Sequence, residues 1–285
     1  MSILIDEKMP VIVQGMTGKF GKIHTELMKK FGTNIVAGVS PSADEPGKEE
    51  VCGIPVYKTV KEAVDNHKEK TRKDVEWSVM FVPAEFALKA ATAALNNNLN
   101  LVIVTEGIPV HDTIKIMNLA REKKKILIGP NSQGVICPGK SKLGIIPNNV
   151  CIRGHVGVIS RSGKLTYEIL NELKNSNIGV STAVGIGIDS LIGADFIDII
   201  KMLEEDDKTK AIVLIGEVKG EFEERAAEFI KENVKKPVVA YIPGFDALDG
   251  KSDKNVRTKI EVFKNAGVTV AKKPSSIVKF LKELK

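Results

Sequence analysis

Near its N-terminus the chain reads Val11-Ile12-Val13-Gln14-Gly15-Met16-Thr17-Gly18-Lys19-Phe20-Gly21. The first part is almost entirely apolar, as in a strand that is buried on both faces of a sheet. Glycines follow with G-x-x-G-x-x-G spacing, a variant of the dinucleotide-binding turn, and an amphipathic helix pattern comes next. Glycine lets the backbone approach a ligand closely, and a helix N-terminus favours a phosphate. The stretch predicts a strand–turn–helix unit that binds a nucleotide-like ligand, although a tight turn without a ligand has the same pattern.

The same alternation of strand and helix patterns continues along the chain. Short apolar runs rich in Val, Ile, Leu and Ala predict strands at 11–16, 35–40, 77–82, 101–105, 126–129, 156–160, 179–185, 211–216, 238–242 and 268–271. Apolar residues at helical spacing predict helices at 22–31, 86–96, 112–123, 165–175, 196–205, 221–234 and 275–284. We therefore expect an α/β protein whose parallel sheets carry helices on both faces.

The alternation breaks once, between Gly129 and Gly154. This stretch has no helix pattern and holds Gly129-Pro130-Asn131, Pro138-Gly139 and Pro147-Asn148-Asn149, which are typical of loops. We place a domain boundary there, with residues 1–129 in one domain and 130–285 in the other. Residues 130–154 form the connecting segment, and each domain is predicted to have five strands.

Composition excludes several classes of protein. The 285 residues are 43% hydrophobic and 27% charged, which argues against disorder. The net charge of +6 comes from interleaved acids and bases, and aromatic residues are only 5%, so we expect no nucleic-acid binding. No apolar run reaches the ~18 residues of a membrane span, and we see no signal peptide. Three widely spaced cysteines fit the reducing cytoplasm, and the four histidines show no metal-binding spacing.

Two further strand ends carry candidate chemistry. Ser160-Arg161-Ser162-Gly163-Lys164 opens a helix, where backbone N–H groups and Lys164 are suited to an anion. It is not a P-loop, because Gly157 and Gly163 enclose five residues instead of four and Leu165 replaces the Mg²⁺-binding hydroxyl. Glu217 follows a buried strand, where a carboxylate is a candidate acid, base or orienting group. The alternative for the first motif is a capped helix without a ligand, and the alternative for Glu217 is a glutamate in a surface loop.

The second predicted strand argues against NAD. A ribose-binding acid is expected at its end, about 20 residues after the glycine turn. The chain instead reads Gly38-Val39-Ser40-Pro41, and the nearest acids, Asp44 and Glu45, come several residues later.

Ten motifs in order resemble the α-subunit family of succinyl-CoA synthetase (succinate–CoA ligase), essentially from end to end. They are 14–18 (QGMTG), 38–41 (GVSP), 81–84 (FVPA), 105–109 (TEGIP), 129–131 (GPN), 143–147 (LGIIP), 160–163 (SRSG), 165–168 (LTYE), 215–217 (IGE) and 236–239 (KPVV).

The resemblance implies a Rossmann-type CoA-binding domain followed by a flavodoxin-like ligase domain. It assigns CoA binding to Thr17, Gly18, Lys19, Phe20, Ser40, Pro41, Val104, Thr105 and Glu106. It places an anion or the acid substrate near Ser162, Gly163, Lys164 and Tyr167. It also implies that ATP or GTP with Mg²⁺ is bound by an ATP-grasp β subunit as partner; a homodimer is the alternative.

The sequence departs from the family pattern where the phosphate-carrying histidine is expected. The family has a Gly-His-Ala-Gly-Ala loop after the strand that matches 238–242, but here no histidine follows His155. Lys164 also replaces the family's threonine. We therefore expect a member without its own phosphohistidine. Glu217, which orients that histidine in the family, remains the catalytic candidate, and an acyl phosphate on Glu217 or Asp246 is the alternative.

Two other functions remain open at this point. One is a non-catalytic module that binds CoA or acyl-CoA for regulation. The other is a subunit of a multi-subunit enzyme that transfers carbamoyl or phosphoryl groups, an analogy that rests on fold alone.

Overall fold

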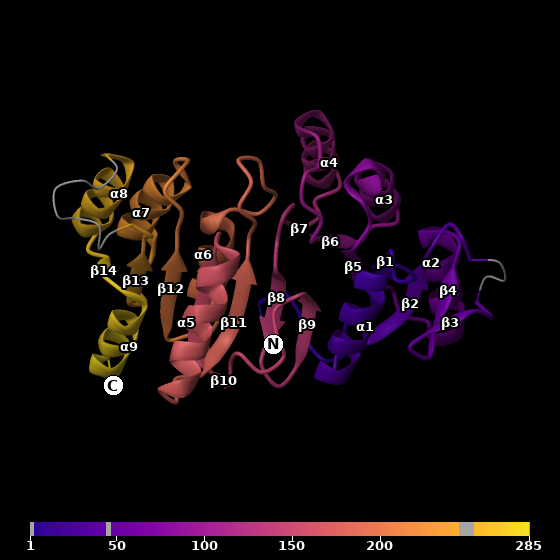
Figure 1. Ribbon diagram of the computed structural model, residues 1–285, viewed down its shortest axis with the longest axis horizontal. Helices are drawn as coiled ribbons and strands as arrows, with labels where there is room; N and C mark the ends of the chain where they lie inside the picture. The colour runs from indigo at the N-terminus through magenta and orange to yellow at the C-terminus, as the bar shows by residue number, and fades with distance from the viewer. Residues whose placement is uncertain (1–2, 44–46, 245–253, 285) are drawn as a thin grey trace.

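Two twisted sheets lie side by side along the long axis of the molecule, with helices packed on both (Figure 1). The computed structural model describes residues 3–43, 47–244 and 254–284. Each sheet has seven strands within these residues. No helix of the described chain has both the length and the apolar composition needed to cross a membrane.

The first sheet is built around β1, which pairs in parallel with β2 and β5. Every residue of β1 and β5 is buried, as their apolar sequence predicts. The strand order is β3 (Glu50–Val51), β4 (Ile54–Tyr57), β2 (Ile35–Val39), β1 (Val11–Gln14), β5 (Trp77–Met80), β6 (Asn100–Ile103) and β7 (Leu127–Ile128). Its helices are α1 (Lys19–Phe31), α2 (Val60–Thr71), α3 (Ala84–Asn96) and α4 (Val110–Glu122).

The second sheet is centred on β10, which pairs in parallel with β11 and β12. The strand order is β14 (Thr269–Ala271), β13 (Val238–Tyr241), β12 (Ala211–Ile215), β10 (Arg153–Ser160), β11 (Val180–Gly185), β8 (Gly134–Cys137) and β9 (Ser141–Gly144). Its helices are α5 (Gly163–Asn175), α6 (Phe196–Glu205), α7 (Phe222–Asn233), α8 (Lys254–Asn265) and α9 (Pro274–Glu283). The chain passes from β10 to β11 and then back across β10 to β12, which makes the carboxyl end of β10 a topological switch point.

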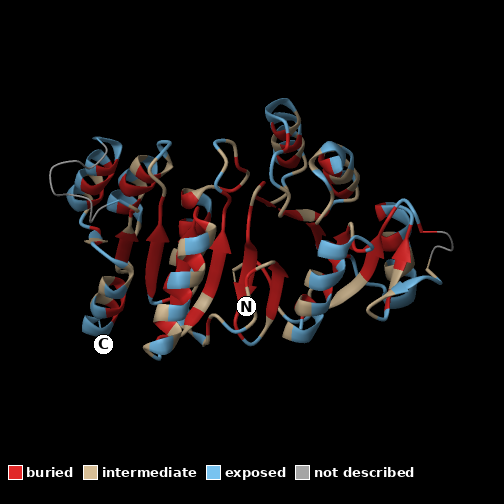
Figure 2. Ribbon diagram, viewed as in Figure 1, coloured by how far each residue is buried: buried red, intermediate tan, exposed pale blue. Residues whose placement is uncertain are grey.

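The helices of the second sheet divide between its two faces. Helices α5 and α9 share one apolar cluster, whereas α6, α7 and α8 contribute to another. The second cluster continues into α1 and the first sheet, so one core runs across both halves of the chain. Figure 2 shows strands that are buried almost throughout and helices that are buried on one side only.

The hairpin β8–β9 joins the two halves. It belongs to the second sheet, yet β9 packs on α1 of the first domain. The Thr33 hydroxyl donates to the Lys142 carbonyl oxygen (2.7 Å), and the Asn148 side-chain amide donates to the Leu27 carbonyl oxygen (2.9 Å). The Lys142 ammonium is fully buried here and donates to Ile146 O and Asn148 Oδ1.

All ten predicted strands and all seven predicted helices are present, with ends shifted by a few residues. The expectation of five strands in each domain is wrong, because β3–β4 and β8–β9 add an antiparallel hairpin to each sheet. β3 and β4 are only two and four residues long, and β8–β9 is interrupted by Pro138-Gly139, so neither shows a long apolar run. The connecting segment 130–154 therefore contains part of the second sheet. Helices α2 and α8 were also not predicted, since their sequences are mostly polar.

Candidate functional site

The loops that follow β1 and β2 meet at the carboxyl edge of the first sheet. The Thr17 and Ser40 hydroxyls are 2.9 Å apart, and the Ser40 hydroxyl lies 2.8 Å from that of Ser42. Ser40 is buried, whereas Thr17 and Pro41 are exposed. The chain of hydroxyl hydrogen bonds thus fixes two of the predicted CoA-binding segments against each other and leaves Thr17 facing outward.

Close backbone packing explains the glycines of the first turn. Gly15 has φ +79°, and a Cβ on Gly21 would lie 2.1 Å from the Gly15 carbonyl oxygen. Gly18 precedes the first residue of α1 and has no side chain to cap the helix. The first-turn N–H groups of α1 therefore have no capping side chain at the N-cap, as in helix starts that bind phosphates. Lys19, the first residue of α1, is exposed beside them.

The loop after β6 reaches the same edge. The Thr105 hydroxyl donates to the Val82 carbonyl oxygen (2.7 Å), and the Val104 N–H donates to the Met80 carbonyl oxygen (3.3 Å). Glu106 follows at an exposed position. All nine predicted CoA-binding residues thus lie in the loops after β1, β2 and β6 or in the first turn of α1, at the end of the parallel strands where ligands of open α/β sheets bind.

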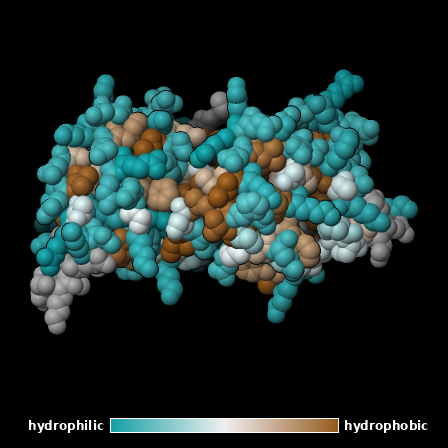
Figure 3. All heavy atoms as spheres, turned by 90° about the horizontal axis from the view of Figure 1, so that it is seen from above, coloured by the Kyte–Doolittle hydropathy of each residue, from teal (hydrophilic) through white to brown (hydrophobic). Residues whose placement is uncertain are grey.

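An aromatic group stands beside this edge. The rings of Phe20 and Phe81 lie 5.7 Å apart, and His24 stacks on Phe81. Burial, with the nearby Lys142 charge, lowers the pKa of His24, which favours the neutral imidazole. Phe20 is 50% exposed. Figure 3, which looks down on the upper side of Figure 1, shows apolar side chains gathered near the middle of that face among hydrophilic ones.

The start of α5 is a second helix terminus without a side-chain cap. Ser162 occupies the cap position as predicted, but its hydroxyl makes no capping hydrogen bond. Lys164 is exposed, and Gly163 is half-buried. Burial raises the pKa of Tyr167, so its phenol stays neutral. These four predicted residues lie within the first turns of one helix, and they suit an anion.

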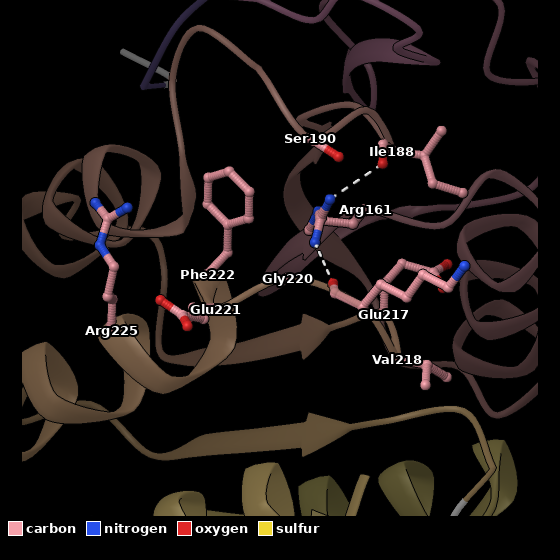
Figure 4. Close-up of a pocket in the computed structure, with 10 residues that line it drawn as sticks. Arg161, Ile188, Ser190, Glu217, Val218, Gly220, Glu221, Phe222 and Arg225 are labelled. Atoms are coloured by element: carbon pink, nitrogen blue, oxygen red, sulfur yellow. Dashed lines mark hydrogen bonds between the residues drawn. The ribbon is translucent and has the colours of Figure 1, made fainter. Parts of the chain in front are cut away.

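A cavity of about 630 Å³ opens at the switch point of the second sheet (Figure 4). Its walls come from the loops after β10, β11 and β12 and from the start of α7, and they include Arg161, Ile188, Glu217, Phe222 and Arg225. Glu217 therefore lies in the cavity, as a candidate acid or base should. The predicted anion residues of α5 do not line it, because α5 packs on the opposite face of the sheet. Arg161, which lines the cavity, directly precedes Ser162 at the start of α5.

Arg161 forms the floor of the cavity and is 3% exposed. Its guanidinium donates to the carbonyl oxygens of Lys219 (3.1 Å) and Ile188 (3.0 Å) and lies 4.6 Å from the centre of the Phe222 ring. It therefore ties the loop after β11 to the loop after β12 (Figure 4).

A buried carboxylate holds the Glu217 backbone. Glu223 accepts the N–H of Glu217 (2.8 Å) and an Nζ–H of Lys259, and its Oε1 lies 3.7 Å from Arg161. Glu223 and Lys259 are both fully buried. The network connects the cavity loops through α7 to α8, so the Glu217 main chain is anchored by charges beneath the cavity.

Several sequence-based candidates fall elsewhere. Asp44, Glu45 and Asp246 lie outside the described residues. His155 is exposed on β10, and its ring bonds the Lys208 carbonyl oxygen. Within the described ranges, no group of three or more His, Cys, Asp or Glu side chains is placed to hold a metal ion.

Comparison with known proteins agrees with this architecture. Two family models match: a CoA binding domain over residues 6–108 and a succinyl-CoA ligase like flavodoxin domain over residues 153–284. A succinate–CoA ligase [ADP-forming] subunit alpha 2 of Archaeoglobus fulgidus is 44% identical over 296 residues, covering 100% of both chains. The chain belongs to the succinate–CoA ligase α-subunit family. A family member from Staphylococcus epidermidis is also 44% identical, over 97% of this chain and 93% of its own.

The fold likeness extends to a larger protein. ATP citrate lyase from Methanothrix soehngenii, solved with citrate and coenzyme A, superposes with a TM-score of 0.83 over 99% of this chain at 23% identity. The match covers only 50% of the length of the ATP citrate lyase chain. At this identity the likeness concerns the fold alone.

The site residues that sequence reasoning missed are the buried charges. The sequence motifs contain Arg161 without indicating a role for it, and they do not contain Glu223 or Lys259. A signal was present, because Glu223 lies on the buried stripe of α7 with Ala226 and Ala227. Opposite charges on two apolar helix stripes indicate a buried ion pair.

Proposed function

We propose that this chain is the CoA-binding α subunit of an acid–CoA ligase and that it has no phosphohistidine of its own. CoA binds at the carboxyl edge of the first sheet, through the loops that carry Thr17–Phe20, Ser40–Pro41 and Val104–Glu106. An oxyanion binds at the start of α5, near Ser162, Gly163, Lys164 and Tyr167. Glu217 serves the reaction from the cavity of the second domain.

The observation that carries this proposal is the convergence of the three CoA segments at one edge of the first sheet. Thr17 contacts Ser40. The Thr105 hydroxyl donates to the carbonyl oxygen of Val82, in the loop after β5, which is the strand between β1 and β6. The uncapped start of α1 supplies N–H donors for a phosphate, and the end of β2 has Ser40 where an NAD-binding domain places an acid. The geometry therefore favours CoA over NAD.

The nucleotide belongs to a partner in this proposal. The relatives are named as α subunits of an ADP-forming ligase, which supports a β subunit as partner. ATP or GTP with Mg²⁺ would be bound by that chain. The lack of a histidine after His155 supports a relay that is lost or supplied by the partner. The three cysteines are unpaired, which supports work in the cytoplasm.

Calorimetric titration of the purified chain with CoA, with NAD as the control ligand, tests the first site. We expect saturable CoA binding and no NAD binding. Gly18→Ala places a Cβ at an ordinary 3.5 Å from the Gly15 carbonyl oxygen, so the fold tolerates it, but the methyl group stands at the phosphate-binding turn. It should weaken CoA binding at least about tenfold.

Lys210→Ala, a substitution at an exposed position of the other domain, is the control and should leave CoA affinity unchanged. A wild-type chain that ignores CoA would overturn the proposal. Nucleotide-dependent CoA ligation by the chain alone would overturn the part that concerns the missing relay.

A further inference from the structure

The loop after β11 connects the cavity of the second domain to the predicted CoA edge of the first. Ile188 and Ser190 of this loop line the cavity (Figure 4). Between them, Asp189 Oδ1 accepts an N–H from the side chain of Asn131 (2.9 Å). The main-chain N–H of Asn131 donates to the carbonyl oxygen of Thr105, in one of the CoA segments (3.0 Å). A single asparagine therefore bonds the CoA edge through its main chain and the cavity loop through its side chain.

The backbone of Asn131 suits an asparagine. Its φ of +52° lies in the left-handed region, where asparagine is tolerated better than most residues other than glycine. The side-chain amide also supplies the donor that the Asp189 carboxylate requires. An aspartate here would have the same backbone tolerance, but it would place a second carboxylate against Asp189. Both properties of asparagine are thus used at this position.

The connection continues from Asp189 into the floor of the cavity. Arg161 donates from Nη2 to the Asp189 carbonyl oxygen (3.1 Å) and from Nη1 to the Lys219 carbonyl oxygen (3.1 Å). Lys219 lies two residues after Glu217 in the loop that follows β12. A series of hydrogen bonds therefore runs from Thr105 at the CoA edge to the loop that carries Glu217.

The other end of the loop after β11 is fixed separately. The Gly193 N–H donates to the Gly129 carbonyl oxygen (2.8 Å), and the Ala194 N–H donates to the Leu127 carbonyl oxygen (2.7 Å). These main-chain bonds hold the residues that lead into α6, whereas the side chain of Asn131 bonds the part that lines the cavity. Loss of the Asn131–Asp189 bond can therefore release the cavity rim without separating the two domains.

We propose that Asn131 and Asp189 are positioning residues that make the CoA edge and the rim of the Glu217 cavity open and close as one unit; the inference rests on the CoA site proposed above. A reaction between groups held on two domains requires a fixed separation of those groups, and this pair supplies it. CoA bound at Val104–Glu106 then stabilises the cavity loops at 187–190 and 217–220 through Asn131.

Hydrogen exchange of the full chain, followed by mass spectrometry with and without CoA, tests the inference. When CoA is present at 100 times its Kd, an amide that exchanges only after the unit opens and CoA leaves should exchange about 100-fold more slowly. We expect this slowing in peptides that cover 15–20 and 103–107 and also in those that cover 186–192 and 216–221. If the chain binds CoA and only the first two regions are slowed, the inference is overturned and the CoA site stands. A chain that binds no CoA overturns the CoA site and this inference with it.

Substitutions show whether the Asn131–Asp189 bond carries the effect. Asp189→Ala removes the acceptor, so CoA should change exchange in the cavity loops by less than about twofold, while the CoA edge remains protected. Asp189→Asn keeps an acceptor oxygen and should restore the protection. Asn131→Ala should behave as Asp189→Ala does. Its matched control is Asn177→Ala, which has the same left-handed backbone (φ +56°) at the end of α5 and should leave the protection intact. Full protection of the cavity loops in Asp189→Ala contradicts the inference.

Discussion

Lys142 and Lys259 are both fully buried, but their partners differ in charge. The Lys259 ammonium bonds the Glu223 carboxylate and lies 3.7 Å from Glu224 Oε2. The Lys142 ammonium bonds only a carbonyl oxygen (2.9 Å) and the Asn148 amide oxygen (2.5 Å). Burial lowers the pKa of Lys142 to about 8.

The difference shows that the charge of the partners decides what a buried lysine does. Lys259 sits opposite a carboxylate that also holds the Glu217 backbone, so its charge helps to shape the cavity loops. Lys142 joins two domains through neutral partners, and its proton is held weakly. Lys259 is part of a charge network beneath the cavity of the second domain, whereas Lys142 packs between the two domains and can lose its proton there.

Removing the charged partner should have the largest effect. Glu223→Gln leaves Lys259 without its main carboxylate, and we expect the free energy of unfolding to fall by about 3–5 kcal/mol. Urea denaturation measures the loss. Glu224→Gln, whose carboxylate is 3.7 Å from Lys259 and partly exposed, is the matched control and should cost far less. Similar losses in the two variants would contradict the role assigned to Glu223.

The pH dependence of Lys142 comes second. Between pH 8 and 10.5 the unfolded chain holds a proton that the folded chain has released, so this lysine makes the protein more stable as pH rises through that interval. Lys142→Met lacks this gain. Between pH 8 and 10.5, we expect the unfolding free energy of wild type to rise by roughly 3 kcal/mol relative to that of Lys142→Met. Lys210→Met, at an exposed position, gives the baseline; a constant difference would refute the lowered pKa.

The neutral partner of Lys142 should matter least. Asn148→Ala removes one acceptor from Lys142 and one donor to Leu27 O, and about 1 kcal/mol per hydrogen bond is the expected cost. Asn97→Ala, which loses a single bond to a carbonyl oxygen within α3, is the control for a hydrogen bond inside one domain. A loss in Asn148→Ala as large as that in Glu223→Gln would remove the contrast between the two lysines.

The parallel strands can be predicted from the sequence because strands that are buried on both faces are long apolar runs, as β1, β10 and β12 are. The hairpin β8–β9 cannot be predicted in this way. It is buried partly by contact with α1 of the first domain, and the charged residue Lys142 lies within its buried strand β9.

The glycine turn at 15–21 is predicted from its place between a strand and a helix, whereas its assignment to CoA and the segments Ser40–Pro41 and Val104–Glu106 come only from the family resemblance. Glu223 is not predicted, because its role depends on contacts with residues that are distant in sequence, such as Lys259.

The hairpin β8–β9 also determines how the chain can be recombined with relatives. A chimaera cut at residue 130 would combine a hairpin from one parent with an α1 from the other. The Thr33–Lys142 and Asn148–Leu27 hydrogen bonds would then join residues from different parents. We therefore expect a chimaera that takes Thr33 and Asn148 from the same parent to be more stable than one that divides them.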